Sequence, residues 1–212
     1  MTNARRLVLI LAIFLAVIAV AALGYRAYRT NAAPTPAELM DAGIVMLPQG
    51  KALPALNFTN QDKEAITLDS LKGQWRLMFF GYTFCPDVCP ATLAQLKQLF
   101  TKLPEKDRNA LGVTFVTVDP ARDTPERLKQ YVEFFNPGFK ALAGDMADTQ
   151  TLANTVGIPF IPADTTQQSY TVDHGANLVL IDPNGRAVGY VRQPMQLDLL
   201  AQQLPRLMEA KR

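Results

Sequence analysis

The chain has 212 residues, of which 49% are hydrophobic and 19% are charged, and its formal net charge is +2. The charge is near zero, and the sequence contains no basic cluster and no aromatic residues interleaved with basic ones. We therefore expect no nucleic-acid partner.

The N-terminal part of the chain contains Leu7 to Leu23, a run without a charged or polar side chain. As a helix this run is ~25 Å long, and Gly24 and Tyr25 bring it close to the ~30 Å hydrocarbon core of a bilayer. The alternative is a cleaved signal peptide, but such peptides have a shorter apolar region of ~7–15 residues. We therefore predict a transmembrane anchor over residues 7–25, preceded by a short cytoplasmic N-terminus over residues 1–6.

The flanking charges set the orientation of this anchor. Arg5, Arg6 and the amino terminus on one side slightly outweigh Arg26 and Arg29 on the other, which favours a cytoplasmic N-terminus. We expect a single-pass protein of the inner (cytoplasmic) membrane whose C-terminal domain lies in the periplasm. Thiols in that compartment tend to oxidise unless they are reduced or bound to metal.

A tether is predicted over residues 26–47, because Pro34 and Pro36 cannot lie in the interior of a helix. Residues 48–212 have the size of one domain with a single core, and we expect a monomer.

The pattern of this domain alternates between strands and helices. We predict a hairpin of strands at 56–59 and 65–68, a buried strand at 77–82, a helix at 89–102, a strand at 113–118, helices at 123–135 and 146–156, a hairpin of strands at 177–182 and 187–192, and a final helix at 197–208. This order is typical of an α/β domain with a central mixed sheet and helices on both faces. A two-cysteine segment at the first strand–helix junction makes the prediction a thioredoxin-like fold.

The two cysteines of the chain, Cys85 and Cys89, lie at this junction, and the only histidine is His174. A helix N-terminus lowers the pKa of a thiol, which favours the thiolate form. Three intervening residues leave room for an ion between the sulfurs and still allow a disulfide. A fixed structural disulfide is the simplest alternative, although a domain of this size does not need one to fold.

Two thiolates and one imidazole suit copper, either as trigonal Cu(I) or as Cu(II) with a weak fourth donor. Zinc normally takes four ligands, and the chain has no further cysteine or histidine. The thiols could instead exchange with disulfides. A lone histidine usually has no metal role, but His174 precedes a strand that would lie beside the cysteine junction. In thioredoxin-like folds a cis-proline typically occupies that approach.

Three aspartates are candidates to orient or tune the ligands from outside the metal site: Asp87, Asp119 and Asp173. An ordinary role in a turn or a helix cap is the alternative for each of them.

The domain resembles the Sco/SenC family of copper-binding, membrane-anchored proteins with a thioredoxin fold. The resemblance covers residues ~47 to 210 and rests on Gly81-Tyr82-Thr83-Phe84-Cys85-Pro86-Asp87-Val88-Cys89-Pro90, on Val118-Asp119-Pro120-Ala121-Arg122-Asp123-Thr124-Pro125 and on Val172-Asp173-His174. One departure is Gly175-Ala176-Asn177, where family members often carry a hydroxyl and bulkier apolar residues. The resemblance implies that Cys85, Cys89 and His174 bind one copper ion, Cu(I) and/or Cu(II).

The resemblance further implies a metallochaperone that delivers copper to the binuclear copper centre of cytochrome c oxidase. Its partner would be the copper-bearing subunit of the oxidase or another copper chaperone. The alternative is a thiol-disulfide oxidoreductase in which Cys85 and Cys89 are the redox-active pair and reduce the cysteines of that centre or of another extracytoplasmic partner. A copper sensor and a peroxidase are weaker alternatives, because the chain lacks a separate signalling domain and the peroxiredoxin pattern around its cysteines.

Overall fold

The computed structural model describes residues 3–166 and 170–211. Its helices are α1 (Asn3–Asn31), α2 (Pro36–Asp41), the 3-10 turn η1 (Leu68–Leu71), α3 (Val88–Lys102), α4 (Glu105–Ala110), α5 (Pro125–Phe135), α6 (Met146–Val156) and α7 (Leu197–Ala210). Its strands are β1 (Ile44–Ala52), β2 (Asn57–Asn60), β3 (Ala65–Thr67), β4 (Trp75–Gly81), β5 (Leu111–Thr117), β6 (Lys140–Ala143), β7 (Phe160–Ile161), β8 (Asp173–His174), β9 (Leu178–Ile181) and β10 (Arg186–Val191).

The main sheet has eight strands in the order β1-β10-β9-β4-β5-β6-β2-β3. The central strands β4, β5 and β6 are parallel, and the outer pairings are antiparallel. Parallel neighbours need a crossover connection, which α3 supplies between β4 and β5 and α5 supplies between β5 and β6. Strands β7 and β8 form a separate two-stranded ribbon.

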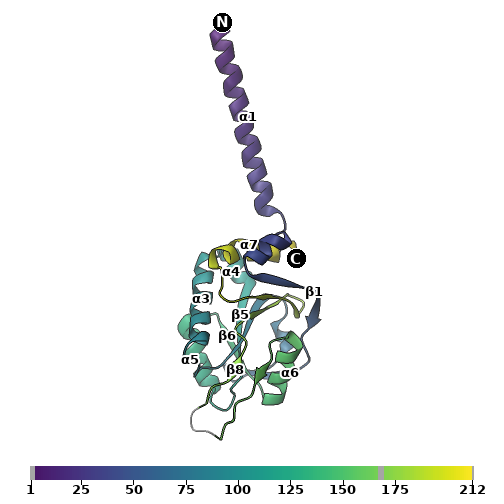
Figure 1. Ribbon diagram of the computed structural model, residues 1–212, viewed down its shortest axis with the longest axis vertical. Coiled ribbons are helices and arrows are strands. Elements are labelled where there is room, and N and C mark those ends of the chain that lie inside the picture. The colour runs from purple at the N-terminus through teal and green to yellow at the C-terminus, as the bar shows by residue number, and fades with distance from the viewer. Residues whose placement is uncertain (1–2, 167–169, 212) are drawn as a thin grey trace.

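Both faces of the sheet are covered (Figure 1). Along β4 the side chains alternate, so that Leu77 and Phe79 pack into one core cluster while Met78 and Phe80 pack into the other. Helices α3, α5 and α7 contribute to the first cluster, and α6 contributes to the second. The prediction of an α/β thioredoxin-like domain with a mixed sheet between helices is confirmed.

The structure corrects the expectation for residues 36–47, which were assigned to the tether. Pro36 opens α2 instead, where Thr35 and Glu38 form a capping box, and Leu39 is buried. The strand β1 then begins at Ile44 and pairs with β10. The two prolines exclude a helix interior, but a proline in the first turn is favourable because its missing N–H has no partner there anyway.

Helix α1 stands away from the domain, and its side chains from Arg5 to Tyr25 are exposed (Figure 1). That stretch is long and apolar enough to cross a membrane by length and composition. The ribbon strand β8 lies toward the end of the domain farthest from α1, whereas α7 lies near it (Figure 1).

Candidate metal centre

The two cysteines follow the end of the central strand β4. Cys85 lies in the loop between β4 and α3 and is half-buried, whereas Cys89 is the second residue of α3 and is fully buried. Both thiols are free. The Cys85 thiol therefore lies near the surface of the site, and the Cys89 thiol lies in its interior.

Gly81, the last residue of β4, allows this close arrangement. A Cβ atom at this position would lie 2.7 Å from the Cys89 sulfur and 2.8 Å from the Phe115 ring. Because such distances are shorter than van der Waals contact, only glycine leaves room for the Cys89 side chain beneath the strand.

His174 reaches the cysteines from the ribbon. In β8 it pairs with Phe160 of β7, and its Nε2 atom lies 3.4 Å from the Cys89 sulfur. Its Nδ1 atom lies 3.2 Å from the carbonyl oxygen of Gly175. A carbonyl can only accept, so Nδ1 carries the hydrogen and Nε2 presents its lone pair to the cysteines. The rings of Phe79 and Tyr82 pack against the imidazole at 6.1 Å and 5.8 Å between centroids.

The ligand atoms of Cys85, Cys89 and His174 all lie within 4.8 Å of one another. An ion with bonds of ~2.3 Å to its ligands would hold three planar donors about 4 Å apart, so small adjustments suffice to bind one ion. Two soft sulfurs and one imidazole nitrogen fit copper better than the oxygen-preferring cations.

Burial favours the uncharged forms of Cys89 and His174. It raises the pKa of the Cys89 thiol, against a hydrogen bond from the Tyr82 backbone that lowers it. It also lowers the pKa of His174, against the hydrogen bond with Gly175 that raises it. For Cys89 the expectation of a lowered thiol pKa is therefore wrong, because desolvation in the core outweighs the hydrogen bond that favours the thiolate.

The family model for SCO1/SenC matches residues 48–209, which is most of the chain. The chain belongs to the SCO1/SenC family. A protein of Stutzerimonas stutzeri that is named as copper-binding is 40% identical over 174 residues, or 82% of this chain and 85% of its own length. The SCO2-like protein of Rickettsia prowazekii is 34% identical and covers 70% of this chain and 71% of its own length.

Solved structures of SCO1/SenC proteins share the fold. ScoI of Bradyrhizobium japonicum, determined with copper bound, superimposes with a TM-score of 0.66 and 34% identity, covering 74% of this chain and 99% of its own. Yeast Sco1 with copper bound gives a TM-score of 0.64 and 27% identity, covering 73% of this chain and 89% of its own.

The three aspartates that were expected around the site of this SCO1/SenC chain lie in different settings. Asp87 is exposed at the start of α3, where it makes no capping hydrogen bond with its side chain. Asp173 is exposed on β8. Asp119 is buried, pairs with Arg122 and accepts a hydrogen bond of 2.9 Å from the hydroxyl of Tyr170. Among these three, Asp119 is the one built into the structure near the site.

A fourth aspartate, Asp123, holds the cysteine loop and was not among the predicted site residues. Its carboxylate is buried and accepts hydrogen bonds from the backbone N–H of Thr83 at 3.0 Å, from the Thr83 hydroxyl at 2.6 Å and from the Thr117 hydroxyl at 2.6 Å. Burial raises its pKa, and these hydrogen bonds oppose the shift. The sequence hid this role, because Asp123 precedes the N-cap residue Thr124 and looks like part of the helix start.

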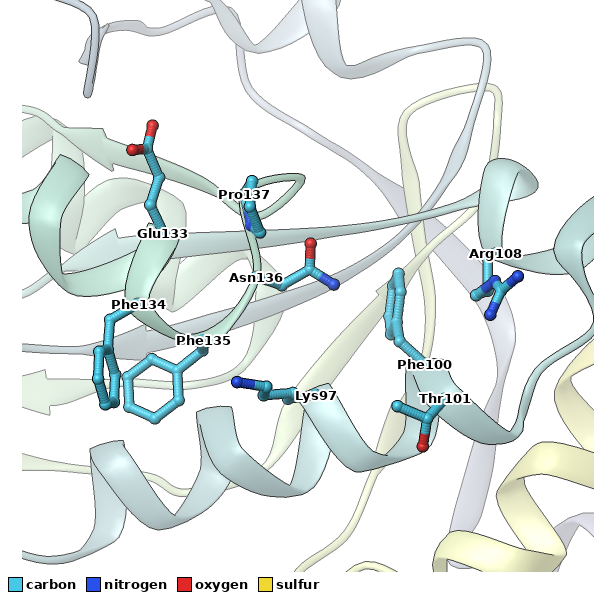
Figure 2. Close-up of a pocket in the computed structure, with 9 residues that line it drawn as sticks. All are labelled: Lys97, Phe100, Thr101, Arg108, Glu133, Phe134, Phe135, Asn136 and Pro137. Carbon is cyan, nitrogen blue, oxygen red and sulfur yellow. The ribbon is translucent and has the colours of Figure 1, made fainter.

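A cavity of about 340 Å³ opens elsewhere, at the C-terminal ends of α3 and α5 (Figure 2). Figure 2 shows the rings of Phe134 and Phe135 on one side of it and Arg108 on the other. No cysteine or histidine lines this cavity, so it is separate from the candidate metal centre.

Proposed function

We propose that this protein is a membrane-anchored copper metallochaperone in which Cys85, Cys89 and His174 hold one copper ion per chain, as Cu(I) and/or Cu(II). The observation that carries the proposal is the convergence of two thiols and one imidazole within 4.8 Å in a member of the SCO1/SenC family. The copper is cargo, and its destination is the binuclear copper centre of cytochrome c oxidase.

The three side chains have separate tasks in this proposal. Cys89 is an uncharged thiol in the core and releases its proton as the sulfur binds the metal. His174 needs no proton release, because its Nε2 atom already presents a lone pair. Cys85 is half-buried and is the ligand that an incoming group of a partner can replace first. Transfer then proceeds by exchanging one ligand at a time.

The setting of the domain fits this role. Helix α1 would anchor the chain in the inner membrane, with the cysteine–histidine domain, which begins at α2, in the periplasm as a monomer. The acceptor would be the copper-bearing subunit of the oxidase or another copper chaperone. The centre lies toward the end of the domain away from α1, which leaves it open to such a partner (Figure 1).

A second candidate function is reduction of a partner's disulfide, and the unequal burial of the two thiols favours it. The Cys85 thiolate would attack one sulfur of the target disulfide and form a mixed disulfide, releasing the other target sulfur as a thiolate. Cys89 would then attack Cys85 and release the second target thiol. Two electrons pass to the target, and the protein retains a Cys85–Cys89 disulfide until an external thiol reductant restores it.

The two functions can be separated by titrating copper without oxygen into the reduced full-length chain in detergent. The variants are the wild type, His174→Ala and the matched control Thr171→Ala, which changes an exposed residue of the same segment. We expect one ion per chain for the wild type and the control. His174→Ala should bind more weakly and show an altered sulfur-to-Cu(II) charge-transfer band, because it loses the nitrogen donor.

The same proteins should then be mixed with a disulfide-bonded peptide, and the peptide thiols should be counted. Reduction that proceeds equally with and without His174, together with no stoichiometric copper binding, would overturn the metallochaperone and support the reductase. One ion per chain that depends on His174 would support the metallochaperone.

A further inference from the structure

Arg122 lies between the segment that carries the histidine and the loop that carries the cysteines. It follows β5 in the chain, and its guanidinium pairs through Nε with the carboxylate of Asp119. The Asp119 side chain is 3% exposed and that of Arg122 is 22% exposed, so this ion pair is largely shielded from water. A shielded pair holds the guanidinium plane in one orientation.

One face of the Arg122 guanidinium packs against Tyr170, which precedes His174 by four residues. The guanidinium carbon lies 3.5 Å from the centroid of the Tyr170 ring, and Nη1 donates to the Tyr170 carbonyl at 3.2 Å. The Tyr170 hydroxyl donates to Asp119 at 2.9 Å. Asp119 and Arg122 therefore fix this tyrosine by its ring, its hydroxyl and its backbone.

Arg122 also contacts the cysteine loop. Its guanidinium carbon lies 4.8 Å from the ring centroid of Phe84, the residue before Cys85, and 5.6 Å from that of Tyr82. The Tyr82 ring in turn packs edge-on against the imidazole of His174. The same guanidinium thus touches residues on both sides of the candidate metal centre.

The histidine side needs such an anchor. His174 lies on a strand of two residues that pairs with another strand of two residues outside the main sheet. An isolated two-stranded ribbon is at best marginally stable in water. The position of Nε2 relative to the sulfurs must therefore depend on contacts outside the ribbon. These include the buried side chain of Val172 in the second core cluster and the contacts of Tyr170 with Arg122 and Asp119.

We propose that Arg122 is a positioning residue that couples the Tyr170–His174 segment to the cysteine loop and thereby sets how much bound copper has His174 as its third ligand. This inference rests on the proposed three-ligand site. It assigns Arg122 no contact with the metal, and its effect must pass through His174.

The test compares Arg122→Lys with Arg127→Lys in the full-length chain in detergent. Arg122→Lys keeps the charge but loses the planar stack and the fork of donors. Arg127 is the matched control, because it also lies over the Phe84 ring, at 4.6 Å, but makes no contact with Tyr170 among the described residues. A second variant, Tyr170→Phe, removes only the hydroxyl that bonds to Asp119 and keeps the ring.

We expect Arg122→Lys to weaken copper binding by about tenfold, the lower range for loss of a group that orients a ligand. The nitrogen hyperfine signal in the electron paramagnetic resonance spectrum of the Cu(II) form should weaken in parallel. Tyr170→Phe should do the same to a smaller degree, and Arg127→Lys should match the wild type. In a His174→Ala background, Arg122→Lys should have no further effect on copper affinity.

The proposal is overturned if Arg122→Lys and Tyr170→Phe both keep the wild-type affinity and nitrogen signal. It is also overturned if Arg122→Lys costs as much without His174 as with it, because the residue would then act through the cysteines or the fold. If the wild type and His174→Ala bind copper alike, the three-ligand site itself is wrong. That result is distinct from equal binding by the wild type and Arg122→Lys, which contradicts only the role of Arg122.

Discussion

The cysteine side and the histidine side of the centre are supported very differently. The cysteines follow β4, which pairs with strands on both of its edges, and Cys89 is fully buried in the first turn of α3. His174 lies on the short strand β8, which among the described residues pairs only with β7. The core of the domain therefore fixes one side, and a few side-chain contacts fix the other.

This difference has a functional consequence for a carrier of metal. The two thiols form a preformed half-site, since Cys89 is fixed in the core and the loop that carries Cys85 is held by the hydrogen bonds of Thr83 to Asp123. A third ligand on a weakly supported strand can approach or leave without disturbing that sheet. Binding and release of a cargo ion both benefit, because the coordination number can change at low cost in stability.

The largest effect that would test this comparison is expected from Cys89→Ser. The substitution removes a buried soft ligand from the cysteine side. Loss of a residue that only hydrogen-bonds to a metal ligand typically lowers metal affinity by about 10–100-fold, and the loss of Cys89 itself should cost more than that. Competition with a Cu(I) chelator would measure it, with Thr171→Ala as the control. A smaller loss than that caused by His174→Ala would reverse the order of the two sides.

The next largest effect is expected from replacing one glycine on each side of the centre with alanine and comparing the losses in stability. In Gly81→Ala the new Cβ meets the Cys89 sulfur and the Phe115 ring, and such overpacking costs about 1–3 kcal/mol in the free energy of unfolding. In Gly175→Ala, on the histidine side, the nearest atom is a methyl carbon of Ile158 at 3.4 Å, so the cost should stay within about 0.5 kcal/mol. Urea unfolding of both variants measures the difference, and equal losses would show that the two sides are equally rigid.

The sequence predicted the rigid parts of the molecule better than the adjustable ones. The run from Leu77 to Tyr82 predicted β4 because a strand buried on both faces must be apolar throughout. The apolar spacing of Leu93, Leu96 and Leu99 predicted α3 because a helix buries one face. Both patterns are local, so the order of residues alone displays them.

Elements that depend on distant partners could not be predicted in this way. Neither β6 nor β8 has a sequence pattern of its own, because each exists through pairing with residues far along the chain. The same holds for Asp123, whose hydrogen bonds to Thr83 span forty residues. The grouping of Cys85, Cys89 and His174 was expected from the family resemblance, but the distances between their ligand atoms depend on how β8 packs against the cysteine loop.

The pH dependence of stability should also distinguish the cysteine side from the histidine side, because Asp123 holds the cysteine loop. Burial raises the pKa of this carboxyl above its ordinary value of 3.8. A group whose pKa is higher in the folded chain stabilises it most below 3.8, and this contribution is lost as the pH rises through the folded pKa. The free energy of unfolding of the wild type should therefore fall with rising pH in this range relative to Asp123→Asn. Urea unfolding of both proteins between about pH 3.5 and pH 7 would detect this fall in stability. Parallel profiles for the two proteins would contradict the prediction.

The smallest effect is expected from Glu38→Gln, far from both sides of the centre, and its sign is opposite. Hydrogen bonds from the Thr35 backbone and from Arg206 lower the pKa of Glu38 from 4.5 to about 2. Its contribution is therefore present above 4.5 and is lost as the pH falls toward 2. In the same pH series, Glu38→Gln should flatten the acid end of the unfolding profile and leave the trend due to Asp123 intact. The contributions of the two carboxyls to stability change in opposite directions with pH. A change in the Asp123 trend in this variant would therefore mean that the trend does not arise on the cysteine side.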